Sequence, residues 1–239
     1  ARKTTAEVDR LSTSAMMATD VWREAAREIR PGLTEKQIAG IIEQRIADLR
    51  GTPSFETIVN AGAKTNPGHG HPTDAVLEPG DLLHVDFGVF FDDYCSDIQR
   101  LLYVRREGEA GPPETLTRAF DSVAGIITST AELCRPGMKG FEVDAEARRI
   151  LREAGYEEYQ HALGHQLGRS VHDGGAILGP QWERYGVTPT LELELNNVFT
   201  LELEIMLPDI GCVGLEEDVC IKENGARFLC PRQMELVIL

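Results

Sequence analysis

The 239-residue sequence predicts an α+β domain that consists of two similar halves. Helical periodicity occupies residues 5–29 and 34–49, and it returns at 114–134 and again from residue 142 onward. An Arg-Pro-Gly turn separates the helices of each pair. The final third of the chain alternates apolar and polar residues from about 196 to 225, which is typical of antiparallel strands.

The two Arg-Pro-Gly turns indicate an internal duplication. Arg135 follows Arg30 by 105 residues. Each half would contain a helix, the turn, a second helix and antiparallel strands, with the halves packed about a pseudo-twofold axis. The simpler alternative is that this tripeptide is a generic helix stop before another helix. Three apolar pairs keep the same spacing: Leu33 and Met138, Ile38 and Val143, Ile46 and Leu151.

The helix boundaries can be read from local signals. Thr34 and Gln37 form a capping box that predicts the start of the second helix, and Gly51 follows its end near Leu49. The first helix has these apolar positions at helical spacing: Val8, Leu11, Ala15, Ala18, Val21, Trp22, Ala25 and Ile29.

Composition excludes several classes of protein. With 39 acidic and 24 basic residues, the net charge of −15 argues against a nucleic-acid or anionic-membrane partner. The chain has no run of 18 apolar residues and no apolar core of a signal peptide, so we expect a cytoplasmic protein. Five cysteines without a CxxC pair suggest small packing residues. The chain opens on Ala1 rather than methionine, which suggests a fragment or a processed product.

A predicted β-hairpin at residues 84–100 contains two aspartates among apolar neighbours. A turn centred on Phe91 and Asp92 would place Asp86 directly opposite Asp97, with Cβ atoms about 4.5 to 5.5 Å apart. Like charges so close together repel, and one carboxyl would take up a proton. A shared multivalent cation would remove this conflict.

A glycine-rich segment, HALGHQLGRSVHD, contains three of the six histidines, namely His161, His165 and His172. Spacing of four residues would place His161 and His165 on one helix face. The glycines at 164, 168, 174 and 175 instead favour turns and close backbone approach. A loop with incidental histidines is the alternative interpretation.

Two acidic segments in the final third have plain alternatives of their own. In VFTLELEIML, Glu202 and Glu204 share one side of a predicted strand, which could simply face solvent. In GLEEDVCI, the three acidic residues Glu216, Glu217 and Asp218 lie between apolar neighbours, where a solvated turn explains them as well as a metal site does.

Together, these segments resemble the "pita-bread" metallopeptidases, the superfamily of methionine aminopeptidase, prolidase and aminopeptidase P. The resemblance covers nearly all residues and favours the X-Pro peptidase branch. DYCSDIQR is similar to its D-Y-x-S-D-x-x-R pattern, and HALGHQLGRSVHD to its H-x-x-x-H-x-x-G-x-x-V-H-[DE] pattern. It implies the pita-bread fold, with a metal site at the centre of the two halves.

The resemblance also implies a ligand set for two divalent metal ions: Asp86, Asp97, His165, Glu202 and Glu216. Asp97 and Glu216 would bridge both ions, and the four carboxylates would balance the charge of two divalent cations. Oxygen-rich ligation with one imidazole favours Mn²⁺, while Zn²⁺ or Co²⁺ would also bind such a set.

Further roles follow from the resemblance. His69, in GHGHPTD, would contact the substrate near the scissile amide, and His172 would donate a hydrogen bond to the carbonyl oxygen. His161 would line the pocket wall. Glu202 would shuttle a proton to the leaving nitrogen. His71 is one step from the motif position, and we interpret it as structural.

The sequence departs from the X-Pro pattern in two places. Gly214 replaces the arginine of R-I-E-D, which weakens the case for proline specificity. Leu203 and Glu204 replace the proline and glycine of F-T-x-E-P-G, so the ligand could be Glu204 rather than Glu202. The N-terminal domain that usually precedes this catalytic domain is absent from residues 1–239, all of which we assign to the catalytic domain.

We therefore expect a two-metal exopeptidase that hydrolyses the peptide bond before proline, acting on short peptides with proline in second position. Dipeptidase and aminopeptidase activities both stay open, and the full-length protein is expected to be a homodimer. Three alternatives are a methionine aminopeptidase-like enzyme, a non-catalytic module that binds peptides or proteins, and a metal-free creatinase-like hydrolase. Retention of metal-binding residue types at all five ligand positions disfavours the last two.

Overall fold

The computed structural model describes residues 2–65 and 70–239. The four long helices are α1 (Thr5–Glu28), α2 (Glu35–Asp48), α3 (Glu114–Leu133) and α4 (Gly140–Glu153). The longer strands are β2 (Ile58–Ala61), β3 (Leu82–Phe87), β6 (Ile98–Tyr103), β9 (Val198–Leu207), β10 (Gly211–Lys222) and β11 (Gly225–Phe228). Shorter strands are β1 (Thr52–Pro53), β4 (Val89–Phe91), β5 (Tyr94–Cys95), β7 (Gly164–His165), β8 (Ile177–Leu178) and β12 (Val237–Ile238). Three 3₁₀ turns span Gly62–Thr65, Glu183–Tyr185 and Thr188–Thr190.

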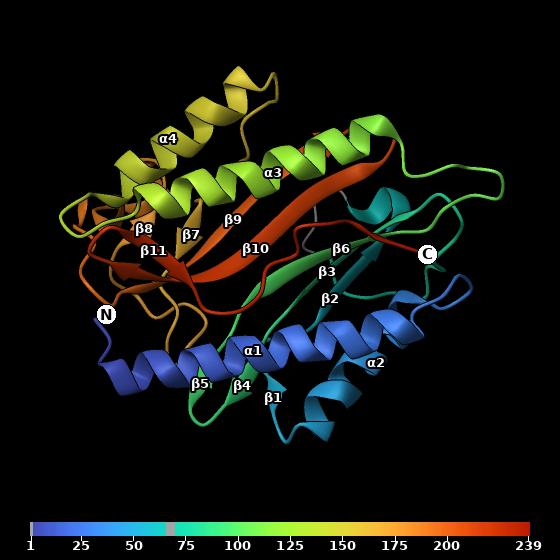
Figure 1. Ribbon diagram of the computed structural model, residues 1–239, viewed down its shortest axis with the longest axis horizontal. Helices are drawn as coiled ribbons and strands as arrows, with labels where there is room; N and C mark the ends of the chain where they lie inside the picture. Colours follow the sequence, from blue (N-terminus) through green and yellow to red (C-terminus); the bar gives the residue numbers. More distant parts are fainter. Residues whose placement is uncertain (1, 66–69) are drawn as a thin grey trace.

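A seven-stranded sheet forms the centre of the molecule (Figure 1). Its strands follow the order β11-β10-β6-β3-β2, while β9 pairs with β10 and β12 pairs with β6. All of these pairings are antiparallel except the one between β12 and β6. The sheet therefore joins strands from both halves of the chain through the β6–β10 contact.

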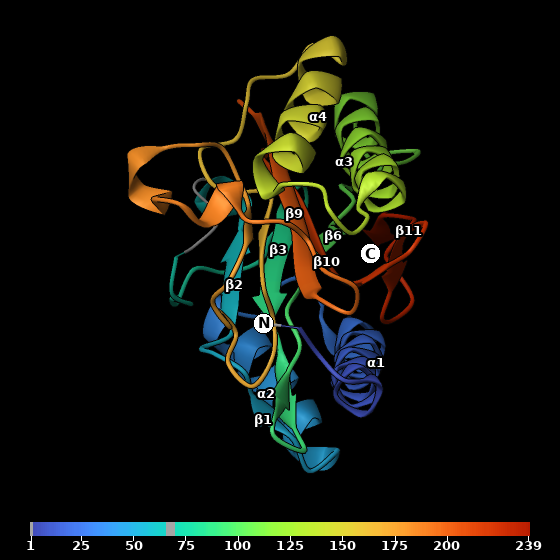
Figure 2. The same ribbon diagram turned by 90° about the vertical axis from the view of Figure 1, so that its left-hand side faces the viewer.

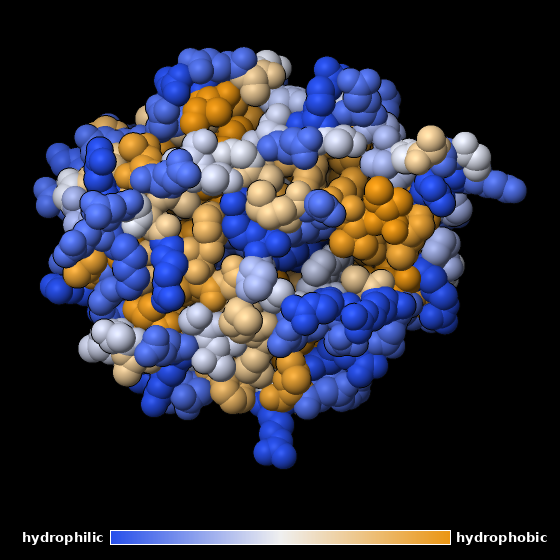
Figure 3. All heavy atoms as spheres, in the orientation of Figure 1, coloured by the Kyte–Doolittle hydropathy of each residue, from blue (hydrophilic) through white to orange (hydrophobic). Residues whose placement is uncertain are grey.

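Helices α1 and α3 cover one face of this sheet, and segment 155–195 crosses the opposite face (Figure 2). On the helix-covered face, hydrophilic side chains lie between several hydrophobic patches (Figure 3). Within the described ranges, no helix combines the length and the apolar character needed to cross a bilayer.

The predicted duplication is confirmed by the helices and by the turns between them. Both ends of α4 lie 105 residues after the corresponding ends of α2. The main-chain N–H of Gly32 donates to Leu77 O, and that of Gly137 donates to Leu193 O, each at 2.9 Å. Both glycines have positive φ, 93° and 87°, which explains why glycine ends each Arg-Pro-Gly turn.

Two large hydrophobic clusters reflect the same duplication. One packs α1 and α2 against β2, β3 and β6, and the other packs α3 and α4 against β9 and β10. The expected apolar face of α1 is buried at all its predicted positions. The capping box of Thr34 and Gln37 is present, with Thr34 Oγ1 accepting from Gln37 N at 3.2 Å. Burial of these faces supplies the main driving force for folding.

The predicted register of the hairpin is wrong by two residues. Asp92 and Asp93 form the turn, with φ of 48° and 66°, and Asp86 pairs with Gln99 rather than with Asp97. Two successive left-handed residues match the twist of a hairpin, and aspartate tolerates this conformation. A two-residue shift leaves each side chain on its original face of the sheet, so the two aspartates still converge.

Candidate metal centre

Four carboxylates reach one site from neighbouring strands of the sheet. Asp86 lies on β3, Asp97 directly precedes β6, and Glu216 and Glu202 lie on β10 and β9. Glu216 pairs with Glu202 on one side and with Gln99 on the other, and Gln99 also pairs with Asp86. Because these positions are in register across four adjacent strands, their side chains project from one small region of the sheet.

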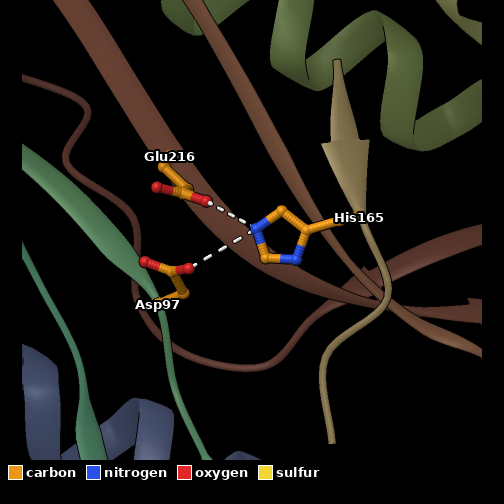
Figure 4. Close-up of side chains that lie close together, drawn as sticks. All are labelled: Asp97, His165 and Glu216. Atoms are coloured by element: carbon orange, nitrogen blue, oxygen red, sulfur yellow. Dashed lines mark ion pairs between the residues drawn. The ribbon is translucent and has the colours of Figure 1, made fainter. Parts of the chain in front are cut away.

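His165 approaches this carboxylate group from the facing segment (Figure 4). Its Nε2 atom lies 3.5 Å from Asp97 Oδ2, 3.8 Å from Glu202 Oε1 and 3.9 Å from Glu216 Oε1. The candidate ligand atoms of Asp97, His165 and Glu216 all lie within 4.8 Å of one another. A single cation could therefore contact all three side chains after small adjustments.

Hydrogen bonds fix the position of His165 beside β9. Its N–H donates to Thr200 Oγ1 at 3.2 Å, and Nδ1 lies 3.4 Å from Gln166 O. A proton on Nδ1 leaves the Nε2 lone pair directed at the carboxylates, as a metal ligand requires. The preceding residue must be glycine, because a Cβ on Gly164 would lie 1.9 Å from Thr200 O. Gly164 therefore serves close backbone approach, as the sequence predicts.

Burial and mutual repulsion raise the pKa values of these carboxyls. Desolvation is the main cause for each of them. The charge of Asp97 adds to it for Asp86, and the charge of Glu216 adds to it for Asp97 and Glu202. Burial, with a contribution from Asp86, raises the pKa of Glu216 to about 8. Without a cation, the protein therefore holds protons in this cluster at neutral pH.

The residues present fit divalent cations. Asp86 Oδ1, Asp97 Oδ1 and Glu216 Oε1 are buried, and none of them has a hydrogen-bond partner among the residues that the structure describes. A buried carboxylate oxygen without a donor is costly unless it binds a cation. Oxygen-rich donors with one imidazole suit Mn²⁺ and also accommodate Zn²⁺ or Co²⁺. These residues can therefore hold divalent metal ions.

A cavity of about 290 Å³ opens onto the carboxylates. His172 lies on its wall, with its ring centroid 4.2 Å from that of His165. Burial, followed by the neighbouring His165, lowers the pKa of His172, so the imidazole is neutral near pH 7. The remaining wall is apolar and comes from three residues: Phe55, Ile58 and Val171.

The remaining residues singled out from the sequence have different surroundings. His161 does not line the cavity; its Nδ1 lies 2.7 Å from Ala162 O and its Nε2 is 4.0 Å from Glu204 Oε1. Glu204 also accepts a hydrogen bond from Cys212 Sγ at 3.1 Å, whereas Glu202 lines the cavity. His69 lies outside the described residues. His71 is exposed, 3.0 Å from Glu56 Oε1.

The solvated-turn alternative for GLEEDVCI is wrong, because the whole segment lies in buried strand β10. Two buried residues with supporting contacts were not singled out from the sequence. Arg100 pairs with Glu217 at 3.0 Å, and its Nη1 donates to the main-chain oxygen of Glu216. Gln99 donates to Glu216 Oε2 at 2.9 Å. The D-x-x-R pattern contained a signal for Arg100, but no pattern pointed to Gln99.

Residues 9–223 match the family described as metallopeptidase family M24. The chain belongs to this family. Its mixed α/β architecture is that of the pita-bread metallopeptidases, so the predicted fold is confirmed.

Two relatives each match nearly the whole of this chain. The chain is 32% identical to the uncharacterized peptidase YqhT of Bacillus subtilis over 99% of its length and 64% of that protein. It is 31% identical to the Xaa-Pro dipeptidase of Pyrococcus furiosus over 98% of its length and 64% of that protein. The chain thus spans about two thirds of the length of these relatives.

Two solved structures also match the whole of this chain. The X-Pro aminopeptidase of Thermotoga maritima superimposes with a TM-score of 0.90 at 28% identity, covering 100% of this chain and 64% of that one. The dipeptidase of Pyrococcus horikoshii has a TM-score of 0.89 at 30% identity, with the same coverage. Both contain the M24 fold together with further sequence.

Proposed function

We propose that this chain is the catalytic domain of a two-metal exopeptidase that hydrolyses the peptide bond before proline. The observation that carries the proposal is that four carboxylates and one imidazole converge beside a cavity, and that three of the buried carboxylate oxygens have no hydrogen-bond donor among the described residues. The Xaa-Pro dipeptidases among the relatives support the substrate class. A non-catalytic binding module has no reason to keep this costly cluster of buried charges.

Asp86, Asp97, His165, Glu202 and Glu216 would hold the two ions, with Mn²⁺ favoured. Bound cations of this kind lower the pKa of a shared water molecule, polarise a scissile carbonyl and stabilise the oxyanion. Asp97 and Glu216 lie centrally, between Asp86 on one side and Glu202 with His165 on the other. This position suits them to contact both ions.

Residues of the cavity can bind the substrate and move its protons. Glu202 lies on the wall of the cavity, where its carboxyl could take up a proton and pass it to the leaving nitrogen. The neutral His172 can donate a hydrogen bond to the substrate carbonyl oxygen and stabilise its developing charge. Phe55 and Ile58 offer an apolar surface on which a proline ring can pack and exclude water.

We further propose that His69 contacts the substrate near the scissile amide and that His161 contributes to the wider pocket wall. The substrate would be a short peptide with proline in second position. The full-length protein would be a cytoplasmic homodimer. Five cysteines, all of them free, agree with a reducing compartment.

Metal analysis combined with a peptide assay tests this function. The purified protein should hold close to two transition-metal ions per chain. With Mn²⁺, it should cleave an Xaa-Pro dipeptide, an Xaa-Pro-containing tripeptide or both, and leave a Met-Ala peptide intact. Turnover of the Met-Ala peptide alone would favour a methionine aminopeptidase-like enzyme. Protein that binds no metal and cleaves none of these peptides would refute the proposal.

A further inference from the structure

A hydrogen-bonded chain of buried side chains runs away from the metal centre along the same face of the sheet. Glu216 Oε2 accepts from Gln99 Nε2 at 2.9 Å, and Gln99 Oε1 lies 3.1 Å from His84 Nε2. The three residues are 2%, 6% and 1% exposed. They lie on three adjacent strands, β10, β6 and β3, so the sheet itself fixes their spacing.

The chemistry of these groups gives the chain one direction. An ionised carboxylate can only accept, so the amide nitrogen of Gln99 must be the donor to Glu216. The amide oxygen of Gln99 is then an acceptor. His84 must therefore carry a proton on Nε2 and donate it to this oxygen. Glutamine can make both bonds at once. Glu216 Oε2 is thereby occupied, while Glu216 Oε1 stays without a described donor and faces His165 Nε2 at 3.9 Å.

Gly214 makes room for this arrangement. A Cβ at position 214 would lie 3.0 Å from Gln99 Oε1 and 3.5 Å from His84 Nε2. The backbone φ of Gly214 lies outside the left-handed region, so the backbone does not require glycine here. The close neighbour of an added Cβ is instead the amide of Gln99. The space beside position 214 is therefore occupied by an amide and an imidazole.

We propose that Gln99 is a positioning residue that holds Glu216 in its metal-binding orientation, with His84 orienting the amide and Gly214 supplying the space. The inference rests on the proposed metal site and deepens it. It also accounts for Gly214, which sequence comparison alone interprets as a loss. A side chain at 214 would crowd the amide of Gln99, whose Oε1 lies 3.0 Å from the added Cβ, so we expect Gly214 and Gln99 to depend on each other.

The first test measures metal affinity in the purified chain after chelator treatment, with Co²⁺ as the probe. Gln99→Met keeps the side-chain volume and removes both hydrogen bonds. We expect Co²⁺ affinity to fall by about 10- to 100-fold, as for other residues that orient a ligand. The visible absorption spectrum of the Co²⁺-loaded protein should also shift, because Glu216 changes its orientation. A merely structural role would leave the affinity and the spectrum unchanged.

The second test is a double-mutant cycle between Gly214→Ala and Gln99→Ala. Gly214→Ala alone should weaken Co²⁺ binding about as much as Gln99→Met does. In the Gln99→Ala background, the extra methyl group has no amide to displace, so Gly214→Ala should cost little further affinity. Equal costs in the two backgrounds would overturn the steric part of the proposal.

Gln233→Leu is the matched control. Gln233 is also a buried glutamine, but among the described residues its side chain bonds only to main-chain groups of Leu101 and Glu235. Its loss should lower the melting temperature and leave Co²⁺ affinity within about twofold of wild type. Unchanged Co²⁺ affinity in Gln99→Met would overturn the proposal.

A further outcome separates this inference from the proposed function. Wild-type protein that binds no Co²⁺ would refute the metal site and, with it, the role of Gln99 toward a metal. The double-mutant cycle of Gly214→Ala and Gln99→Ala can also be measured as free energies of urea unfolding in metal-free protein. That measurement would still decide whether the two positions are coupled. Additive unfolding free energies would then refute that part as well.

Discussion

Glu202 of β9 and Glu216 of β10 lie directly opposite each other on neighbouring antiparallel strands. Two carboxylates in this relationship repel each other, and burial makes the repulsion stronger. The pKa of each is raised, with burial as the main cause. The protein therefore folds at a cost in this region unless protons or cations neutralise the cluster.

A pH dependence of stability follows for the metal-free protein. Glu216 has a pKa of about 8 in the folded protein and an ordinary value of 4.5, so the folded state binds more protons than the unfolded chain between these values. The free energy of unfolding should therefore fall as pH rises from about 4.5 to 8. Urea unfolding of chelator-treated protein at pH 5, 6, 7 and 8 measures this. A profile that rises over this interval would contradict the assignment, and metal-loaded protein should show a flatter profile.

Metal removal should destabilise the protein at neutral pH. A ligand at about 1,000 times its Kd stabilises the folded state by about 4 kcal/mol. Chelation also leaves the carboxyls of Asp97 and Glu216 close together, where they repel each other unless they take up protons. We expect the melting temperature to drop by several degrees after chelator treatment and to recover when Mn²⁺ is restored. An unchanged melting temperature would count against a resident metal.

Asp97→Asn should separate metal binding from stability. The substitution removes one ligand oxygen with its charge, so activity and metal binding should be lost. At pH 8, the metal-free variant should nevertheless be at least as stable as metal-free wild type, because one repelling carboxylate is gone. Asp93→Asn in the exposed hairpin turn is the control, and it should keep wild-type activity. Full activity in Asp97→Asn would exclude it as a ligand.

The buried ion pair between Arg100 and Glu217 should be essential for folding. Arg100 and Glu217 are both almost fully buried, and Arg100→Met would leave Glu217 charged and unpaired. We expect a loss of about 3–5 kcal/mol in the free energy of unfolding. Adding Glu217→Gln should recover most of it. The exposed pair of Arg27 and Glu24 provides the comparison, since Arg27→Met should cost at most about 1 kcal/mol.

The approach of the histidine segment to β9 can be tested with one methyl group. Gly164→Ala would place Cβ 1.9 Å from Thr200 O, which forces His165 away from the carboxylates. Metal affinity should fall together with stability. Gly125→Ala in α3 is the matched control, because no atom lies within 4 Å of its added Cβ. That substitution should stabilise the helix by about 0.5–1 kcal/mol. Normal metal binding in Gly164→Ala would show that the segment can move without consequence.

The predictions that succeeded depend on local patterns. Periodicity and caps placed all four helices close to their observed bounds, because burial of one helix face and satisfaction of the first-turn N–H groups are properties of neighbouring residues. The 105-residue repeat predicted the duplicated architecture. The proposed metal ligands, in contrast, came from the resemblance of several segments taken together, because each acidic or histidine segment alone had a plain alternative.

Other features depend on contacts between residues far apart in the chain. The hairpin register was instead a local choice that the sequence left open, since Asp92 and Asp93 both adopt left-handed conformations at the turn. Whether Glu202 or Glu204 faces the cavity depended on how β9 aligns with the histidine segment. The bond from Gln99 to Glu216 spans 117 positions.

The sequence by itself determined the helices and the duplication, because periodicity and caps lie within one segment and the duplication is a repeat of such segments. Only the tertiary structure decided which side chains are the neighbours of Glu216 and how closely Gly214 approaches Gln99. Those features depend on the distances at which separate strands are brought together, and no single segment encodes such distances.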